Sequence, residues 1–214
     1  MQMLASIFSV FSLLFHSSDS TNLAKLTPTP PTHIVCIDPG HGGDDTGAVY
    51  KDLREAEVNL DIAQRLQKLL QKDNIGVVLT RTDNTLTLSN SDRANICNQG
   101  HANLLVAIHL NYSDDPTLDY TQGLYGTSSD SKDQVFTEVM HQALVDSLGV
   151  PDHDITDFGD NVMQKATMPA TLQETVFLSN DNEYAQLTDG TGNRQEQIAV
   201  ALDNGIKDWF TKNR

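Results

Sequence analysis

Basic residues are scarce in this chain. Its 214 residues include 14 lysines and arginines against 29 aspartates and glutamates, which gives a formal net charge of −15 at pH 7. Proteins that bind nucleic acid present clustered lysine and arginine side chains to the phosphates, and the sequence contains no such cluster. The composition therefore argues against nucleic acid as a partner.

Cysteine is also rare, because only Cys36 and Cys97 occur. Two cysteines are too few for the disulfide framework that stabilises many small secreted proteins. Each lies in an apolar stretch, so the sequence predicts two small buried side chains rather than a framework. On this interpretation the cysteines say little about the redox compartment.

A long hydrophobic run is absent, since no apolar stretch reaches the ~20 residues of a membrane-spanning helix. Residues 3–15 are apolar over the length typical of the core of a secretory signal. No lysine or arginine precedes Lys25, and no clear small-residue cleavage site follows. We expect a secretory signal, and hence a periplasmic or extracellular protein without a stable transmembrane segment. A loosely docked tail is the alternative.

The rest of the chain alternates between strand-like and helix-like patterns. Residues 17–32 are polar and rich in proline, which predicts a linker. We therefore divide the chain into a signal and linker over residues 1–32 and one folded domain over residues 33–214. Short apolar runs predict strands, and apolar positions at helical spacing predict helices. The strands are expected at 33–38, 75–80, 104–110 and 170–177, and the helices at 54–72, 91–98, 131–148 and 193–210.

Strands that alternate with helices are typical of an α/β protein. The pattern predicts a single-domain three-layer sandwich, with a mostly parallel twisted sheet and helices on both faces. One further strand is expected between residues 111 and 169. In the helix over residues 131–148, the side chains expected to face the core are Val135, Val139, Leu144 and Leu148.

Three polar residues stand where open α/β sheets bind ligands, at the carboxyl ends of strands. His41 follows the first strand in DPGHGG, His109 lies near the end of LLVAIHL, and Glu55 begins the first long helix. Two imidazoles and one carboxylate, with a fourth position open, are the ligand set of a catalytic zinc site. Glu57 is the alternative to Glu55. Residues two apart on a helix point roughly 200° away from each other, so only one of the two can face the metal, and the geometry does not choose between them.

A further carboxylate, Glu174, lies late in the apolar strand predicted at residues 170–177. Burial of a carboxylate in such a strand costs free energy, which a functional role would explain. The alternative is a glutamate on an edge strand that faces water and is not buried. Its expected place, at the same sheet end as His41 and His109, favours a functional role. The remaining histidines are expected to lie outside the site: His16, His33, His101, His141 and His153.

At these positions the sequence resembles the zinc-dependent N-acetylmuramoyl-L-alanine amidases of the type 3 family. The similarity covers about residues 34–210 and comprises DPGHGG with DTGA, EAEVNL, TRTD, IHLN and PATLQETVFLSN, in that order. The resemblance implies that His41, Glu55 and His109 bind zinc, which selects Glu55 over Glu57. It also implies that Glu174 is the catalytic general acid–base.

The resemblance implies a peptidoglycan hydrolase that cleaves the amide bond between the lactyl group of N-acetylmuramic acid and the L-alanine of the stem peptide. Zinc would activate the attacking water, and we expect a monomer. A zinc carboxypeptidase acting on wall peptides is the main alternative, with Arg81 or Arg93 holding a terminal carboxylate. A non-haem iron oxygenase is another alternative, but it would give Glu174 no role in the reaction. An inactive peptidoglycan-binding scaffold would be expected to lack at least one of His41, Glu55, His109 and Glu174, and all four are present.

Some members of this family carry an inhibitory helix between the third metal ligand and the catalytic glutamate. Here residues 111–169 must hold a strand, a long helix and their loops. That leaves little room for a blocking element, so we expect an open site that needs no activator.

Overall fold

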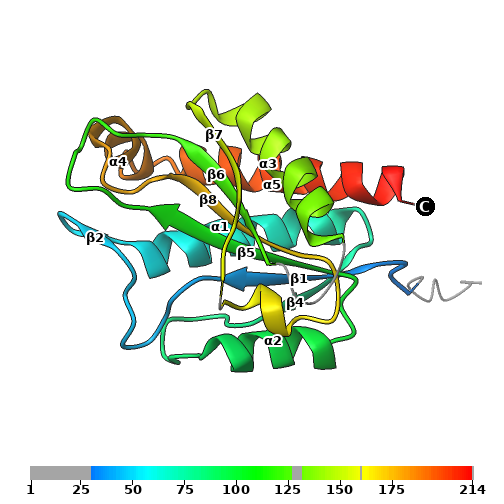
Figure 1. Cartoon of the computed structure of the whole chain (residues 1–214). Helices are drawn as coiled ribbons and strands as arrows, with labels where there is room; N and C mark the ends of the chain where they lie inside the picture. The colour runs from blue at the N-terminus through cyan, green and yellow to red at the C-terminus, as the bar shows by residue number, and fades with distance from the viewer. Residues whose placement is uncertain (1–29, 127–131, 160, 214) are drawn as a thin grey trace, which may run out of the picture.

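A six-stranded sheet forms the centre of the computed structural model, which describes residues 30–126, 132–159 and 161–213 (Figure 1). The strand order is β4-β1-β5-β8-β6-β7. The four parallel strands are β4 (Gly76–Leu79), β1 (Ile34–Pro39), β5 (Leu104–Asn111) and β8 (Ala170–Phe177). The other two, β6 (Thr121–Tyr125) and β7 (Asp152–Asp157), run antiparallel to them. The sheet is mostly parallel, as predicted.

Helices cover both faces of the sheet (Figure 1). One face packs against α1 (Glu55–Lys72), α3 (Asp133–Leu148) and α5 (Asn193–Lys212). The other face packs against α2 (Asn90–Gln99) and the 3-10 turn η1 (Met163–Lys165). The hairpin of β2 (Val49–Tyr50) and β3 (Leu53–Arg54) leads into α1, and α4 (Asp181–Leu187) follows β8. These layers confirm the α/β sandwich.

The alternation of side chains along β5 separates the two hydrophobic cores. Leu104, Val106 and Ile108 belong to the core beneath α1, α3 and α5, whereas Leu105 and Ala107 belong to the core beneath α2. Successive side chains of a strand point to opposite faces. His109 therefore lies on the α2 face, and α3 lies on the opposite one.

The predicted inward face of α3 is wrong at Val135 and only partly right at Val139. Val135 is 52% exposed, whereas Phe136 and Met140 are fully buried. Leu144 and Leu148 are buried as expected, and Val139 packs only partly against the core. Residues four apart share one helix face, so the buried stripe follows Phe136, Met140, Leu144 and Leu148. Val135 lies one residue, or about 100°, away from it.

The segment between β5 and β8 contains two strands instead of the single one expected. β7 has the sequence DHDITD and is mostly exposed at the edge of the sheet. It has no apolar alternation because neither of its faces contributes much to a core. The sequence therefore offered no signal for this strand.

Cys36 and Cys97 are fully buried, as predicted, but they form a disulfide bond. The interpretation of two unpaired buried side chains is wrong. The bond joins β1 to α2 across 61 residues of sequence. The pairing depends on how α2 packs against β1, which the local sequence around each cysteine does not reveal.

Replacing both cysteines by alanine is expected to lower the free energy of unfolding by roughly 2–5 kcal/mol, because the bond constrains a long loop of the unfolded chain. Urea denaturation of the variant and of the oxidised and reduced wild type measures this loss. An unchanged denaturation midpoint in both the variant and the reduced protein would contradict a stabilising role for the bond.

The predicted secretory signal and most of the predicted linker, residues 1–29, lie outside the described residues. Among the helices of residues 30–126, 132–159 and 161–213, none is both long enough and apolar enough to cross a membrane.

Candidate metal centre

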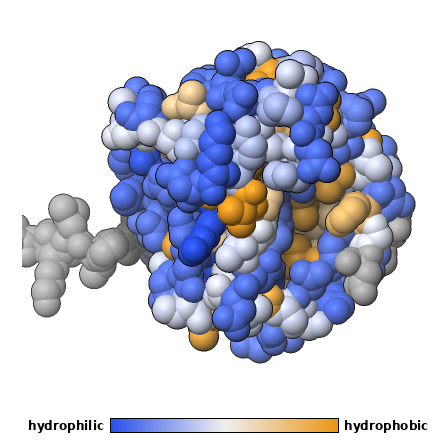
Figure 2. Space-filling model, turned by 90° about the vertical axis from the view of Figure 1, so that its left-hand side faces the viewer, coloured by the Kyte–Doolittle hydropathy of each residue, from blue (hydrophilic) through white to orange (hydrophobic). Residues whose placement is uncertain are grey.

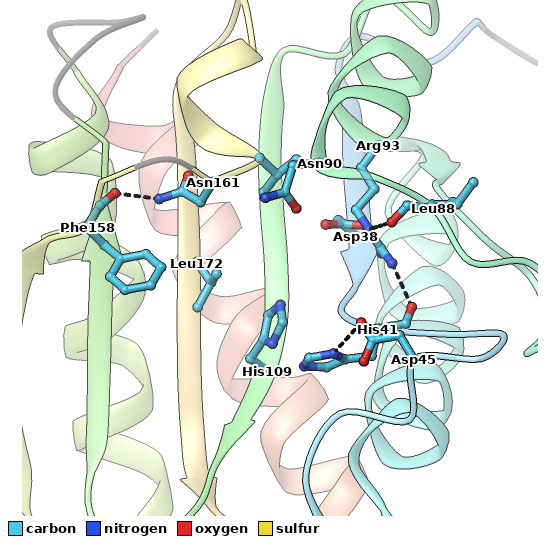
Figure 3. A pocket seen from close by; sticks show the side chains of 11 residues that line it. Asp38, His41, Asp45, Leu88, Asn90, Arg93, His109, Phe158, Asn161 and Leu172 are labelled. Carbon is cyan, nitrogen blue, oxygen red and sulfur yellow. Dashed lines mark hydrogen bonds and ion pairs between the residues drawn. The ribbon is translucent and has the colours of Figure 1, made fainter.

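The face at the carboxyl ends of the parallel strands is hollowed, and apolar side chains gather in the hollow within a mainly hydrophilic surface (Figure 2). A cavity of about 180 Å³ lies there beside His41 and His109 (Figure 3). This is the sheet end at which open α/β proteins bind ligands. The candidate residues therefore border a space that is open to a ligand.

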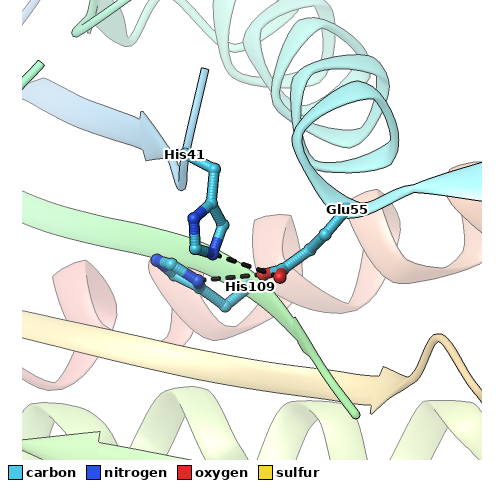
Figure 4. Close-up of side chains that lie close together, drawn as sticks. All are labelled: His41, Glu55 and His109. Carbon is cyan, nitrogen blue, oxygen red and sulfur yellow. Dashed lines mark hydrogen bonds and ion pairs between the residues drawn. The ribbon is translucent and has the colours of Figure 1, made fainter. Parts of the chain in front are cut away.

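His41, Glu55 and His109 come from three different elements and point toward one another (Figure 4). His41 Nε2 lies 3.1 Å from Glu55 Oε2, and His109 Nδ1 lies 3.0 Å from Glu55 Oε1. One ligand atom from each residue lies within 4.8 Å of the others. Within the described part of the chain, this is the group of histidine and carboxylate side chains arranged to hold a metal ion.

The loop after β1 turns sharply to bring His41 to this point. His41 has φ of 62°, which is left-handed backbone that few residues other than glycine adopt. Gly47, with φ of 63°, leaves the necessary space, because a Cβ atom there would lie 2.6 Å from both Glu55 Oε2 and His41 Cδ2. A Cβ atom on Gly40 would overlap the ring of His109. The glycines of this loop let the three side chains approach closely.

Glu55 begins α1, and hydrogen bonds fix both of its carboxylate oxygens. Its Oε1 accepts from the backbone N–H of Leu110 at 3.1 Å and from Asn59 Nδ2 at 3.3 Å. Its Oε2 accepts from the backbone N–H of Ala48 at 2.9 Å. The side chain is only 5% exposed, so the carboxylate is held rigidly between the two imidazoles.

Glu57 lies on the other side of α1, as the helix geometry predicted. Its carboxylate forms an ion pair with Arg54 at 3.4 Å and its side chain is 51% exposed. The structure therefore places Glu55, and not Glu57, beside the two histidines.

The buried carboxylate favours positive charge at the centre of the cluster. Burial opposes ionisation, but hydrogen bonds from His109 and His41 hold the pKa of Glu55 well below its usual range. Burial lowers the pKa of His41, yet its hydrogen bonds to Glu55 and Asp45 and the charges of these two carboxylates together raise it to about 9. Burial also lowers the pKa of His109, but the hydrogen bond to Glu55 and the nearby carboxylates of Glu174 and Glu55 together raise it. The carboxylate of Glu55 would stabilise a bound metal cation for the same reason that it stabilises protonated histidines.

Asp45 fixes the orientation of the His41 ring. Its Oδ2 lies 2.9 Å from His41 Nδ1, and its Oδ1 accepts from the backbone N–H of Gly47 at 3.1 Å. Nε2 of His41 is then the nitrogen that faces Glu55. A carboxylate that binds the second nitrogen of a metal-binding histidine is a common outer partner at metal sites. The sequence interpretation missed this residue, although its spacing of four from His41 was visible.

Glu174 lies next to His109, because the two residues pair in the register of β5 and β8. β8 lies between β5 and β6 in the sheet, so Glu174 is not the edge-strand residue of the alternative interpretation. Its Oε2 is buried and has no hydrogen-bond partner among the described residues. Burial raises the pKa of this carboxyl group. Glu174 is therefore a carboxyl group near the cluster with an oxygen free to exchange a proton.

Arg81 and Arg93 are buried and hold the loop that carries His41. Arg93 forms an ion pair with Asp38 at 2.8 Å. Both guanidinium groups also donate to backbone carbonyls, Arg81 to those of Pro39, Gly40 and Ala56, and Arg93 to those of Pro39, His41 and Leu88. These bonds occupy the two arginines that a carboxypeptidase would use to hold a terminal carboxylate.

The other described histidines lie away from the cluster. His33 stacks on Phe210, His153 stacks on Tyr120, and His141 forms a hydrogen bond with Asp152. His101 follows α2, and His16 lies outside the described residues.

A family model described as N-acetylmuramoyl-L-alanine amidase matches residues 35–208. Among curated proteins, the amidase LytC of Bacillus subtilis is 29% identical over 193 residues, which cover 89% of this chain and 38% of LytC. The amidase CwlM of Bacillus licheniformis is 30% identical over 183 residues, covering 84% of this chain and 70% of CwlM. The chain thus spans well under half of the length of LytC.

Two solved structures share the fold. The catalytic domain of the amidase CwlV from Bacillus (Paenibacillus) polymyxa has 32% identity and a TM-score of 0.76, covering 84% of this chain and 98% of that one. An N-acetylmuramoyl-L-alanine amidase from Clostridium difficile 630 has 30% identity and a TM-score of 0.79, and the match covers 87% of this chain and 100% of that one. The chain belongs to the type 3 family of N-acetylmuramoyl-L-alanine amidases.

Proposed function

We propose that this chain is a zinc-dependent hydrolase that cleaves the amide bond between the lactyl group of N-acetylmuramic acid and the L-alanine of the stem peptide in peptidoglycan. The convergence of His41, Glu55 and His109, with Glu174 next to His109, carries this proposal. Two imidazole nitrogens and one carboxylate suit zinc and leave a position for water or substrate, as catalytic zinc sites require.

A zinc ion held by His41, Glu55 and His109 would lower the pKa of water toward ~7 and polarise the scissile carbonyl. Glu174 accepts the proton of the attacking water and delivers it to the nitrogen of the leaving L-alanine. Its unpaired Oε2 and its raised pKa suit a group that must take up a proton and then release it. The hydrogen bonds around Glu55 keep its carboxylate ionised and oriented throughout.

Asp45 is expected to strengthen zinc binding by holding His41 in the tautomer that presents Nε2. The variant Asp45→Asn should bind zinc roughly 10–100-fold more weakly, as measured by competition with a chromophoric chelator. Asp44→Asn is the matched control, because Asp44 is an exposed neighbour that bonds to Thr87 through its backbone N–H and not through its carboxylate. Equal zinc affinity in both variants would contradict the role assigned to Asp45.

We further propose that the protein acts in the periplasm or outside the cell. Its proposed substrate lies there, and disulfides such as Cys36–Cys97 persist mainly in oxidising compartments.

The site is proposed to be open without an activator. Between β5 and β8, the helical elements of the described residues are α3 and η1. α3 packs on the sheet face opposite to His109, and η1 is a single turn. Neither is placed to cover the metal ligands as a blocking helix would.

Digestion of purified peptidoglycan by the purified chain, with no second protein added, tests the proposal. Mass spectrometry should detect free stem peptides that begin with L-alanine, and glycan strands that keep the lactyl group. A carboxypeptidase would instead shorten the peptides at their carboxyl ends and leave them attached. Activity that appears only after an activator protein is added would contradict the open site.

A further inference from the structure

The cavity beside His41 and His109 is small and has an apolar wall. Its volume of about 180 Å³ is below the roughly 300–1,000 Å³ of pockets that enclose a drug-sized ligand. Phe158 and Leu172 lie on one side and Leu88 on the other (Figure 3). Phe158 is 48% exposed, although burial of a phenylalanine ring is strongly favourable. The cavity thus suits one compact, partly apolar group rather than an extended peptide.

The loop that carries Phe158 is held in place from within. Asn161 donates to the backbone carbonyl of Phe158 at 2.5 Å and to that of Gly159 at 2.9 Å, and it accepts from the backbone N–H of Met163 at 2.8 Å. The Asn161 amide is therefore occupied, and it positions the exposed ring at the cavity.

Asn90 supplies an unoccupied polar group at the wall of the cavity. It is exposed at the start of α2 and lines the cavity, and its side-chain amide makes no hydrogen bond to the described residues. A primary amide can donate and accept at the same time. It can therefore pair with both the carbonyl and the N–H of another amide.

Fixed charge at the cavity disfavours an anion. Arg93, the guanidinium that lines it, is already paired with Asp38. Asp45 adds a second carboxylate to the wall. The carboxylate of Glu55 would offset part of the charge of a divalent cation at the metal centre. The carboxylates of a stem peptide would find no free cationic partner in the cavity. A neutral acetamido group could form hydrogen bonds with the side-chain amide of Asn90.

We propose that this cavity binds the acetamido group and ring of the sugar that carries the lactyl group, and that the stem peptide lies on the opposite side of the metal centre. The assignment rests on the proposed amidase function. Glu174 does not line the cavity, yet it must reach the leaving amine of the peptide. The peptide therefore lies beside Glu174, and the sugar side of the scissile bond lies against Asn90 and Phe158.

Two synthetic substrates test the assignment: an N-acetylmuramoyl peptide, and the same peptide carrying only the lactyl group on its amide nitrogen. Asn90→Ala and Phe158→Ala should each lower kcat/KM for the sugar-bearing substrate by roughly 3–10-fold, mainly through KM, because each removes one contact. Neither should change cleavage of the lactyl peptide. Asn204→Ala and Val135→Ala, at exposed positions on α5 and α3, are the matched controls and should leave both substrates unaffected.

Binding of N-acetylglucosamine to the metal-free protein provides a second measurement that needs no catalysis. NMR should show a shift of the Asn90 side-chain amide signals with this sugar and none with glucose, which lacks the acetamido group. Unmoved Asn90 signals, or variants that slow both substrates equally, would overturn the sugar assignment. Failure of the wild type to cleave either substrate would instead overturn the amidase function.

Discussion

Replacing Glu174 by glutamine is expected to reduce turnover by roughly 10²–10⁴-fold, the contribution of a positioned general acid–base. Glutamine has nearly the same shape as glutamate but cannot accept the proton of the attacking water. Glu174 lies next to His109 in the sheet and outside the three-residue metal cluster. Zinc content and the denaturation midpoint should therefore remain close to those of the wild type.

The measurement is the single-turnover rate of muropeptide cleavage, with bound zinc determined on the same samples. Glu183→Gln is a poor control because Glu183 forms a buried ion pair with Arg194. Glu57→Gln is the better one, since Glu57 is exposed on α1. Near-normal turnover of the Glu174 variant would place the proton acceptor elsewhere. Loss of zinc from it would make Glu174 a ligand and leave Glu55 misassigned.

Replacing His109 by alanine is expected to abolish both zinc binding and amidase activity. Its imidazole is one of three groups in the cluster, and two remaining protein donors are fewer than a catalytic zinc site uses. His153→Ala is the control, because His153 is exposed and stacks on Tyr120 away from the cluster. Elemental analysis of the dialysed proteins gives zinc per chain, and the muropeptide assay gives activity.

The denaturation midpoint of the metal-free proteins separates loss of a ligand from loss of the fold. We expect metal-free His109→Ala and metal-free wild type to unfold at similar urea concentrations. A variant that is folded and still binds one zinc per chain with wild-type affinity would remove His109 from the ligand set.

The parallel part of the sheet could be predicted because its strands are buried on both faces. Residues 104–110 form a nearly continuous apolar run, and β5 occupies that position at the centre of the sheet. β6 and β7 are different, since β7 is polar and exposed. Their positions depend on pairing with β8 and with each other, which is a tertiary effect.

The convergence of His41, Glu55 and His109 could be predicted because each lies beside a local signal, although only the family resemblance selected Glu55 over Glu57. His41 stands among glycines, Glu55 begins a helix, and His109 ends an apolar strand. The groups that support them were less visible. Arg93 bonds to the loop of His41 across 52 residues of sequence, and the cysteine pair spans 61. Such contacts follow from the packing of α2 against β1, which no local pattern specifies.

Metal dependence of muropeptide cleavage tests the central claim most directly. Peptidoglycan is digested with wild type as purified, after removal of metal by a chelator, and after addition of one equivalent of zinc, and mass spectrometry identifies the products. The account predicts stem peptides with a free L-alanine amino group from the first and third samples, and none from the second. Full cleavage by protein shown to contain no metal, or cleavage at another bond after zinc is restored, would contradict it.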